Sequence, residues 1–191
     1  GLIVNTDKAG DSKFTTTQAY ISAAYIKKIT KDSANFLTLA LQPGISSKAF
    51  DINALTFDNQ WDGDSYDPNL GTGESFTRTR ITYFDLGAGA SYLWRKTQRT
   101  QVNVGFSVLH LTKPKHSFFY NQDIQLDMKF AFSGIGEFPV AAKLDVVPTF
   151  LYQSQGKFHE TLLGVFVKYY LKPINEMPTA LSVGGFTRLT T

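Results

Sequence analysis

The chain has 191 residues, of which 42% are hydrophobic, 14% aromatic and 18% charged, with a net charge of +3 and no cysteine. The absence of cysteine excludes disulfides, thiolate metal sites and cysteine nucleophiles. No run reaches the roughly 18 apolar residues that a transmembrane helix requires. The lysines and arginines do not form a basic stripe, so we expect no nucleic-acid partner. We expect a single domain over residues 1–191.

Apolar and polar residues alternate with a period of two in the first part of the chain, which predicts strands. One candidate strand spans residues 35–45 and another residues 16–27, and a polar connection at 28–33 would join them into a hairpin. Pro43 has no backbone amide to donate. We therefore expect the strand register to break at Pro43, near the end of the strand or at a bulge, and the strand to end soon after it.

The alternation is clearest over residues 83–94, where one face carries large apolar side chains and the other carries small and polar ones. The apolar set is Phe84, Leu86, Ala88, Ala90, Tyr92 and Trp94, and the other set is Tyr83, Asp85, Gly87, Gly89 and Ser91. The same rule predicts strands at residues 101–108, 125–133, 140–152, 159–171 and 179–188. Together with the first two, these segments make eight candidate strands.

The predicted connections alternate in length. Short ones lie at residues 28–33, 95–100, 134–139 and 172–178, a long one covers about 50–80, and an intermediate one covers 111–123. Only the short connection at 153–158 departs from this rule. Outer-membrane barrels pair short periplasmic turns with longer extracellular loops. The sequence therefore predicts an all-β, antiparallel, up-and-down transmembrane β-barrel whose long extracellular loop covers about 50–80.

A soluble β-barrel or sandwich is the main alternative, because such sheets also alternate between a buried and a wetted face. The polar face of the predicted strands is rich in glycine and in side chains that suit a wet lumen, among them Asp85, Gln101, Asn103, Lys129, Asp145 and Lys168. The apolar face runs through up to six consecutive outward positions. These features favour the membrane barrel without excluding the soluble one.

The sequence offers no catalytic constellation. His110, His116 and His159 lack a second histidine or a carboxylate at a metal-binding spacing, and no Gly-x-Ser-x-Gly or P-loop motif is present. A hydrolase built from Ser, His and Asp side chains at a barrel rim stays possible but has no motif to support it. We predict a protein without enzymatic activity or a cofactor.

The long predicted loop is acidic, with no Lys or Arg between Phe50 and Thr77. Asp62, Asp64 and Asp67 are close enough in sequence to be candidates for calcium, although their spacing is not that of an EF-hand; a solvated loop is the alternative. Glycines and a Pro68 turn indicate a folded excursion, and large loops often carry binding functions. We expect partner contacts from Asp58, Trp61, Asp62, Asp64, Tyr66 and Asp67.

Five stretches resemble the PorP/SprF family of outer-membrane proteins, which is associated with type IX secretion and gliding motility in Bacteroidetes. They are Asp7-Lys8-Ala9-Gly10, Tyr66-Asp67-Pro68-Asn69, residues 84–89, residues 105–111 followed by Pro114, and residues 148–152 with Gln155-Gly156. The resemblance implies export or anchoring of surface adhesins through contacts with other secretion proteins, and no active site. Two other functions stay open: a barrel transporting a small or hydrophobic solute, and a soluble barrel that binds a ligand.

The resemblance also bears on the ends of the chain. Members of this family are usually longer, so we expect the eight strands to be an arc of a larger barrel that is truncated at both ends. The chain begins at Gly1 with no apolar leader. We therefore expect a signal peptide upstream and a location in the outer membrane, with lipid around the barrel.

Overall fold

The computed structural model describes residues 1–31, 34–74, 77–119, 124–171 and 179–190. These residues form ten strands and two short 3-10 helices. The strands are β1 (Leu2–Ala9), β2 (Phe14–Ile21), β3 (Ala23–Lys28), β4 (Asn35–Ala49), β5 (Arg80–Thr97), β6 (Thr100–Leu109), β7 (Lys129–Ala141), β8 (Leu144–Gln155), β9 (Phe158–Tyr170) and β10 (Ala180–Thr190). No helix in the described ranges is long and apolar enough to cross a membrane.

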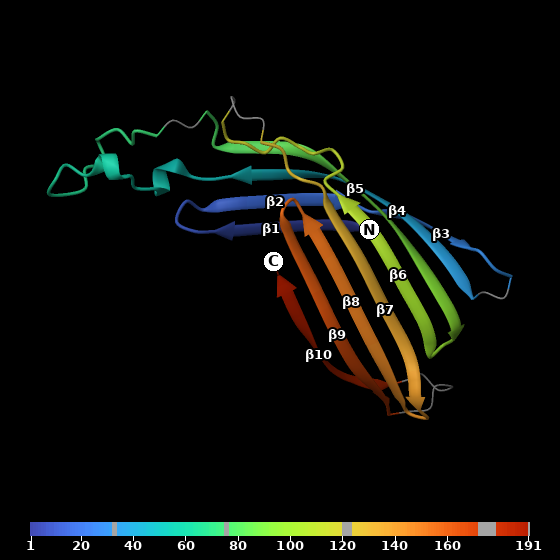
Figure 1. Ribbon diagram of the computed structural model, residues 1–191. Helices are drawn as coiled ribbons and strands as arrows, with labels where there is room; N and C mark the ends of the chain where they lie inside the picture. The colour runs from blue at the N-terminus through green and yellow to red at the C-terminus, as the bar shows by residue number, and fades with distance from the viewer. Residues whose placement is uncertain (32–33, 75–76, 120–123, 172–178, 191) are drawn as a thin grey trace. The chain divides into compact units, whose positions relative to one another are not determined.

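The strands form one sheet in the order β1-β2-β4-β5-β6-β7-β8-β9-β10, with β3 also paired to β4 (Figure 1). The ladders are antiparallel and mostly join strands that are neighbours in sequence. The sheet is not closed in the part of the chain that the structure describes. The predicted all-β, antiparallel, up-and-down architecture is therefore confirmed.

The fold divides into two compact units. The loop unit comprises Gly1–Ser22, Pro43–Leu86 and Thr112–Leu126, and the sheet unit comprises Ala23–Gln42, Gly87–Leu111 and Asp127–Thr191. Strands β4 and β5 contribute residues to both units. The loop unit therefore contains most of the two long connections, whereas the sheet unit contains the short turns after β5, β7 and β8.

The described residues form ten strands rather than the eight expected from the sequence. Strand β1 was missed because its apolar residues Leu2, Ile3 and Val4 are consecutive and show no alternation. The predicted strand at 16–27 is two strands, β2 and β3, separated at Ser22. The predicted hairpin is correct, since both strands pair with β4.

Pro43 does not end its strand, because β4 continues to Ala49. Tyr20 pairs with Gly44, and Ala23 pairs with Leu41. From the first pair to the second, the chain advances three residues on one side of the ladder and goes back three on the other, so the register is the same on both sides of Pro43. Only the ladder is interrupted there, as a residue without an amide hydrogen requires. The expected break in register and the expected early end of the strand were both wrong.

The predicted connection at 134–139 lies inside β7, and the turn to β8 falls at Ala142 and Lys143. Gly134 and Gly136 of this segment pair with Val104 and Val102 of β6. Strand β7 consequently begins at Lys129 and β8 at Leu144, later than the predicted strands at 125–133 and 140–152. The predicted connection at 172–178 lies outside the described residues.

In the sheet unit the ladders separate apolar from polar side chains. Residues directly opposite each other share a face, so one face carries the rows Phe106, Phe132 and Tyr152, and Phe138, Val146, Val167 and Val183. The opposite face carries Gln101 with Glu137, and Asp145, Lys168 and Ser182. The predicted division into two faces is confirmed, and it is the apolar one that is exposed: Phe132 is 45% and Val183 66% accessible.

Burial is inverted relative to a water-soluble protein. Across the described residues the largest fully buried side chains are Asp85, Asp145 and Ser46, whereas the buried large apolar and aromatic ones are Ile81, Tyr83 and Tyr170. Charged residues are almost never fully buried in soluble proteins unless they are paired, and monomers rarely expose large contiguous apolar patches. The sheet thus buries polar side chains and exposes apolar ones.

This inversion predicts the cost of a charge on each face. Phe132→Lys should destabilise the protein in lipid vesicles by about 2–4 kcal/mol. Ser133→Lys, one residue along on the polar face, keeps its charge away from lipid and should cost clearly less. Urea unfolding of the reconstituted protein measures both. Equal costs for the two variants would mean that the exposed face meets water rather than lipid.

Candidate functional site

The acidic loop, residues 51–74, is folded around one buried side chain. Gln60, at the end of the 3-10 helix Asp58–Gln60, is 5% exposed. Its Oε1 accepts a hydrogen bond from the Phe57 amide at 3.0 Å, and its Nε2 donates to the Leu70 carbonyl at 3.4 Å. The Asp67 amide donates to the Gln60 carbonyl at 2.8 Å. The loop therefore has a defined conformation, as its turn residues predicted.

The tip of the acidic loop is a small hairpin that presents two aromatic side chains. Trp61 pairs with Tyr66, and these residues are 58% and 44% exposed. Asp62 Oδ1 accepts hydrogen bonds from the amides of Ser65 at 2.7 Å and Asp64 at 2.8 Å. These two bonds hold the pKa of the Asp62 carboxyl below its ordinary value. Gly63, between Asp62 and Asp64, has a φ of +107° and lets the chain turn there.

All six predicted partner-binding residues lie in this one segment. Asp58 begins the short helix, Trp61 and Tyr66 are at the hairpin, and Asp62, Asp64 and Asp67 are in or beside its turns. The carboxylates of Asp62 and Asp67 accept bonds from their own turns. In the described ranges no three His, Cys, Asp or Glu side chains gather as a metal site. Calcium binding by Asp62, Asp64 and Asp67 therefore stays a prediction.

The stability of the turn at Asp62 should depend on pH. The pKa of the Asp62 carboxyl is lowered in the folded loop from its ordinary value of 3.8. The ionised carboxylate therefore stabilises the turn fully at pH values above 3.8, and this stabilisation is lost as the pH falls through the lowered pKa. NMR shifts of the Asp64 and Ser65 amides should move with a midpoint below 3.8. The titration should survive in Asp64→Asn and disappear in Asp62→Ala. A midpoint at or above 3.8 would contradict the hydrogen-bonded turn.

The two long connections also touch within the loop unit. Phe118, from the connection between β6 and β7, packs edge-on against Phe50 and Phe14 with ring centroids 4.9 and 6.3 Å apart. Arg78 Nη2 donates to the Ser117 carbonyl at 2.9 Å. These contacts lie at the base of the acidic loop, beside the end of β4 and the start of β5.

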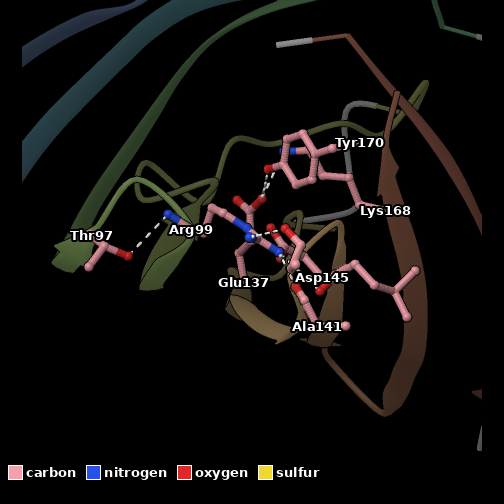
Figure 2. Close-up of polar contacts among 9 residues, drawn as sticks. Thr97, Arg99, Glu137, Ala141, Asp145, Lys168 and Tyr170 are labelled. Atoms are coloured by element: carbon pink, nitrogen blue, oxygen red, sulfur yellow. Dashed lines mark hydrogen bonds and ion pairs between the residues drawn. The ribbon is translucent and has the colours of Figure 1, made fainter. Parts of the chain in front are cut away.

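A second polar site, the turn cluster, was not predicted. It consists of Arg99, Glu137, Asp145, Lys168 and Tyr170 in the sheet unit (Figure 2). Arg99, in the turn between β5 and β6, donates to the carbonyls of Ala141 and Ala142 at 2.7 Å each. It also forms an ion pair with Asp145, whose Oδ1 accepts from Arg99 Nε at 2.8 Å. One guanidinium thus fastens the β5–β6 turn to the β7–β8 turn.

Glu137 is the second anion of the turn cluster, and it is 8% exposed. Its carboxylate accepts from Lys168 Nζ at 2.7 Å, from Gln101 Nε2 at 2.9 Å and from the Tyr170 hydroxyl at 3.2 Å. The Tyr170 ring lies 5.1 Å from both the Arg99 guanidinium carbon and Lys168 Nζ. Two cations and two carboxylates therefore balance at this end of the polar face, and each carboxylate has a cationic partner.

The signal for this cluster in the sequence is weak. Asp145 and Lys168 were correctly placed on the polar face, but Glu137 was assigned to the predicted connection at 134–139 and Arg99 to a turn. Their proximity depends on the register of β6 to β9, in which Asp145 pairs with Lys168 and Glu137 with Gln101. The hydrogen bonds to Asp145 raise the pKa of Arg99, so this cation stays charged.

The guanidinium of Arg99 should not be replaceable by an ammonium. Arg99→Lys keeps the charge but loses the planar fork that reaches three carbonyls and Asp145 at once. We expect this variant to unfold at a clearly lower urea concentration than the parent. The matched Arg95→Lys removes one exposed bond to Gln101 and should leave the midpoint nearly unchanged. Equal shifts for the two variants would contradict the role of the cluster.

A family model described as "Type IX secretion system membrane protein PorP/SprF" matches residues 1–187 of the 191. No curated protein and no solved structure matches the chain.

Proposed function

The chain belongs to the PorP/SprF family of type IX secretion system membrane proteins, and we propose that it is a non-enzymatic β-barrel component of that system in the outer membrane. In this role it supports the export or anchoring of surface adhesins and, through them, gliding motility. The observation that carries the proposal is the exposed apolar face of the sheet unit, opposite a face that holds paired charges.

Lipid is the environment that this face fits. Lipid-exposed backbone must satisfy its hydrogen bonds within the protein, which closed sheets achieve with apolar side chains outward and polar ones inward. The sheet unit has this polarity over β5 to β10, with Val165 and Phe106 each about half exposed. A role in lipid also explains why the largest fully buried side chains are those of Asp85, Asp145 and Ser46.

The acidic loop is the proposed contact for a secreted or surface partner. Long loops of outer-membrane barrels face the cell exterior, and exposed aromatic side chains on a rigid frame are typical anchors of protein interfaces. Trp61 and Tyr66 meet this description, since the turn bonds of Asp62 and the buried Gln60 hold their hairpin. The surrounding carboxylates would favour a partner with a basic surface.

The membrane placement is tested by cell fractionation and gel migration. The protein should sediment with outer membranes, require detergent for extraction, and migrate differently on gels before and after heating. A water-soluble monomer with ordinary migration would contradict both the secretion role and the alternative of a solute transporter, and would favour the soluble ligand-binding barrel.

The secretion role is tested in cells. Deleting the gene should reduce adhesin display and surface motility, and the parent gene should restore them; an unchanged display would favour solute transport. Trp61→Ala with Tyr66→Ala should weaken adhesin display while the barrel still inserts. Phe158→Ala, which removes an exposed aromatic side chain at the β8–β9 turn, is the control.

The calcium hypothesis has its own test. The triple variant Asp62→Asn, Asp64→Asn, Asp67→Asn removes three negative charges from turns that asparagine tolerates. If calcium binds there, it should raise the melting temperature of the parent and not that of the triple variant. If calcium does not change the melting temperature of the parent, the calcium hypothesis is wrong.

A further inference from the structure

A groove of about 580 Å³ opens in the sheet unit along β3, β4 and β5. The groove is lined by the short side chains of Ala23 and Ala88. The larger side chains of Tyr25, Leu39 and Leu41 also line it, and these residues are more than half exposed. None of its lining side chains is charged. Its size falls within the range of about 300–1,000 Å³ that is typical of small-molecule sites.

The groove runs toward a group of basic residues. In the ladder between β3 and β4, Ala23 pairs with Leu41, Tyr25 with Leu39 and Lys27 with Leu37, so these pairs follow one another on the same face. Lys27 therefore lies about 7 Å beyond Tyr25, two residues along the strand. It is exposed.

More positive charge surrounds this end of the groove. Lys28 and Lys31 are exposed on the same segment as Lys27. The Arg95 amide donates to the Ala34 carbonyl at 2.6 Å, which places the end of β5, with the exposed Lys96, beside the start of β4. The described residues 23–31, 34–42 and 88–100 contain no Asp or Glu. The apolar groove thus ends beside several exposed lysines, and the carboxylate nearest to them in sequence, Asp32, lies outside the described residues.

We propose that this groove binds an anionic phospholipid, with an acyl chain along Ala23, Leu41 and Ala88 and the phosphate beside Lys27. Basic residues at the edge of a membrane attract anionic headgroups, and the apolar lining suits a hydrocarbon chain. A peptide would leave its amides without partners in such a lining. The inference rests on the proposed membrane placement, and it names a ligand that this placement does not require.

The test uses fluorescence quenching in bilayers. The chain has two tryptophans, so Trp61→Phe leaves Trp94, which lies on the same face of β5 as Ala88. The variant is reconstituted into phosphatidylcholine bilayers that contain increasing amounts of brominated phosphatidylglycerol or brominated phosphatidylcholine. Quenching of Trp94 then gives the relative affinity for the two lipids.

We expect brominated phosphatidylglycerol to be preferred about fivefold or more. Adding Lys27→Gln should reduce this preference about fivefold, the contribution of one basic residue at an anionic surface. Lys157→Gln, which removes an equally exposed lysine from the β8–β9 turn, should leave it unchanged. Ala88→Phe fills the groove and should weaken quenching by the anionic lipid. Inorganic phosphate at millimolar concentration should not compete, because the acyl chain contributes the apolar part of the binding.

The outcomes separate this inference from the proposed function. Equal quenching by the two brominated lipids, or equal effects of Lys27→Gln and Lys157→Gln, would overturn the lipid site and leave the membrane placement intact. Competition by inorganic phosphate would also overturn it. If neither lipid quenches Trp94, the membrane placement fails and the lipid site fails with it. Heat-dependent gel migration of each variant shows that it has folded.

Discussion

The strand register is the constraint on which the rest of the structure depends. Side chains alternate along a strand, so a slip of one residue would exchange the two faces of the sheet. In β8 and β9 such a slip would bring Val146 and Val167 to the polar face and expose Asp145 and Lys168 on the apolar one. Moving a carboxylate or ammonium into an apolar environment is far more costly than losing one ladder hydrogen bond. Solvation therefore enforces the pairing of the strands.

The turn cluster and the ladders support each other through this constraint. Glu137 and Asp145 are both less than 10% exposed, and a buried charge is tolerated only with a partner and further hydrogen bonds. Those partners, Lys168 and Arg99, come from β9 and from the β5–β6 turn, and only the observed register brings them within reach. The acidic loop differs in this respect, since its conformation depends on Gln60 and Asp62 within the loop itself.

The alternation of side chains was enough to predict the sheet, its antiparallel order and the face of the residues to which it assigned one between β4 and β9. It could not reveal β1, where Leu2, Ile3 and Val4 are consecutive, or distinguish the paired Gly134 and Gly136 from turn residues. The loop was predicted as a folded excursion and its six residues do share one segment. The turn cluster was missed because Arg99 and Asp145 are 46 residues apart, and a local pattern does not show which residues of different strands lie opposite each other.

The Arg99 contacts also bear on the order of folding. Each hairpin of the sheet unit can form from neighbouring residues, and such local contacts form early and quickly. Arg99 belongs to the β5–β6 hairpin, whereas Ala141, Ala142 and Asp145 belong to the β7–β8 hairpin. Their bonds therefore appear only after the two hairpins have docked side by side in the correct order. The cluster therefore stabilises the assembled pair of hairpins and neither hairpin alone. Its bonds favour the correct order of the hairpins at a late step of folding.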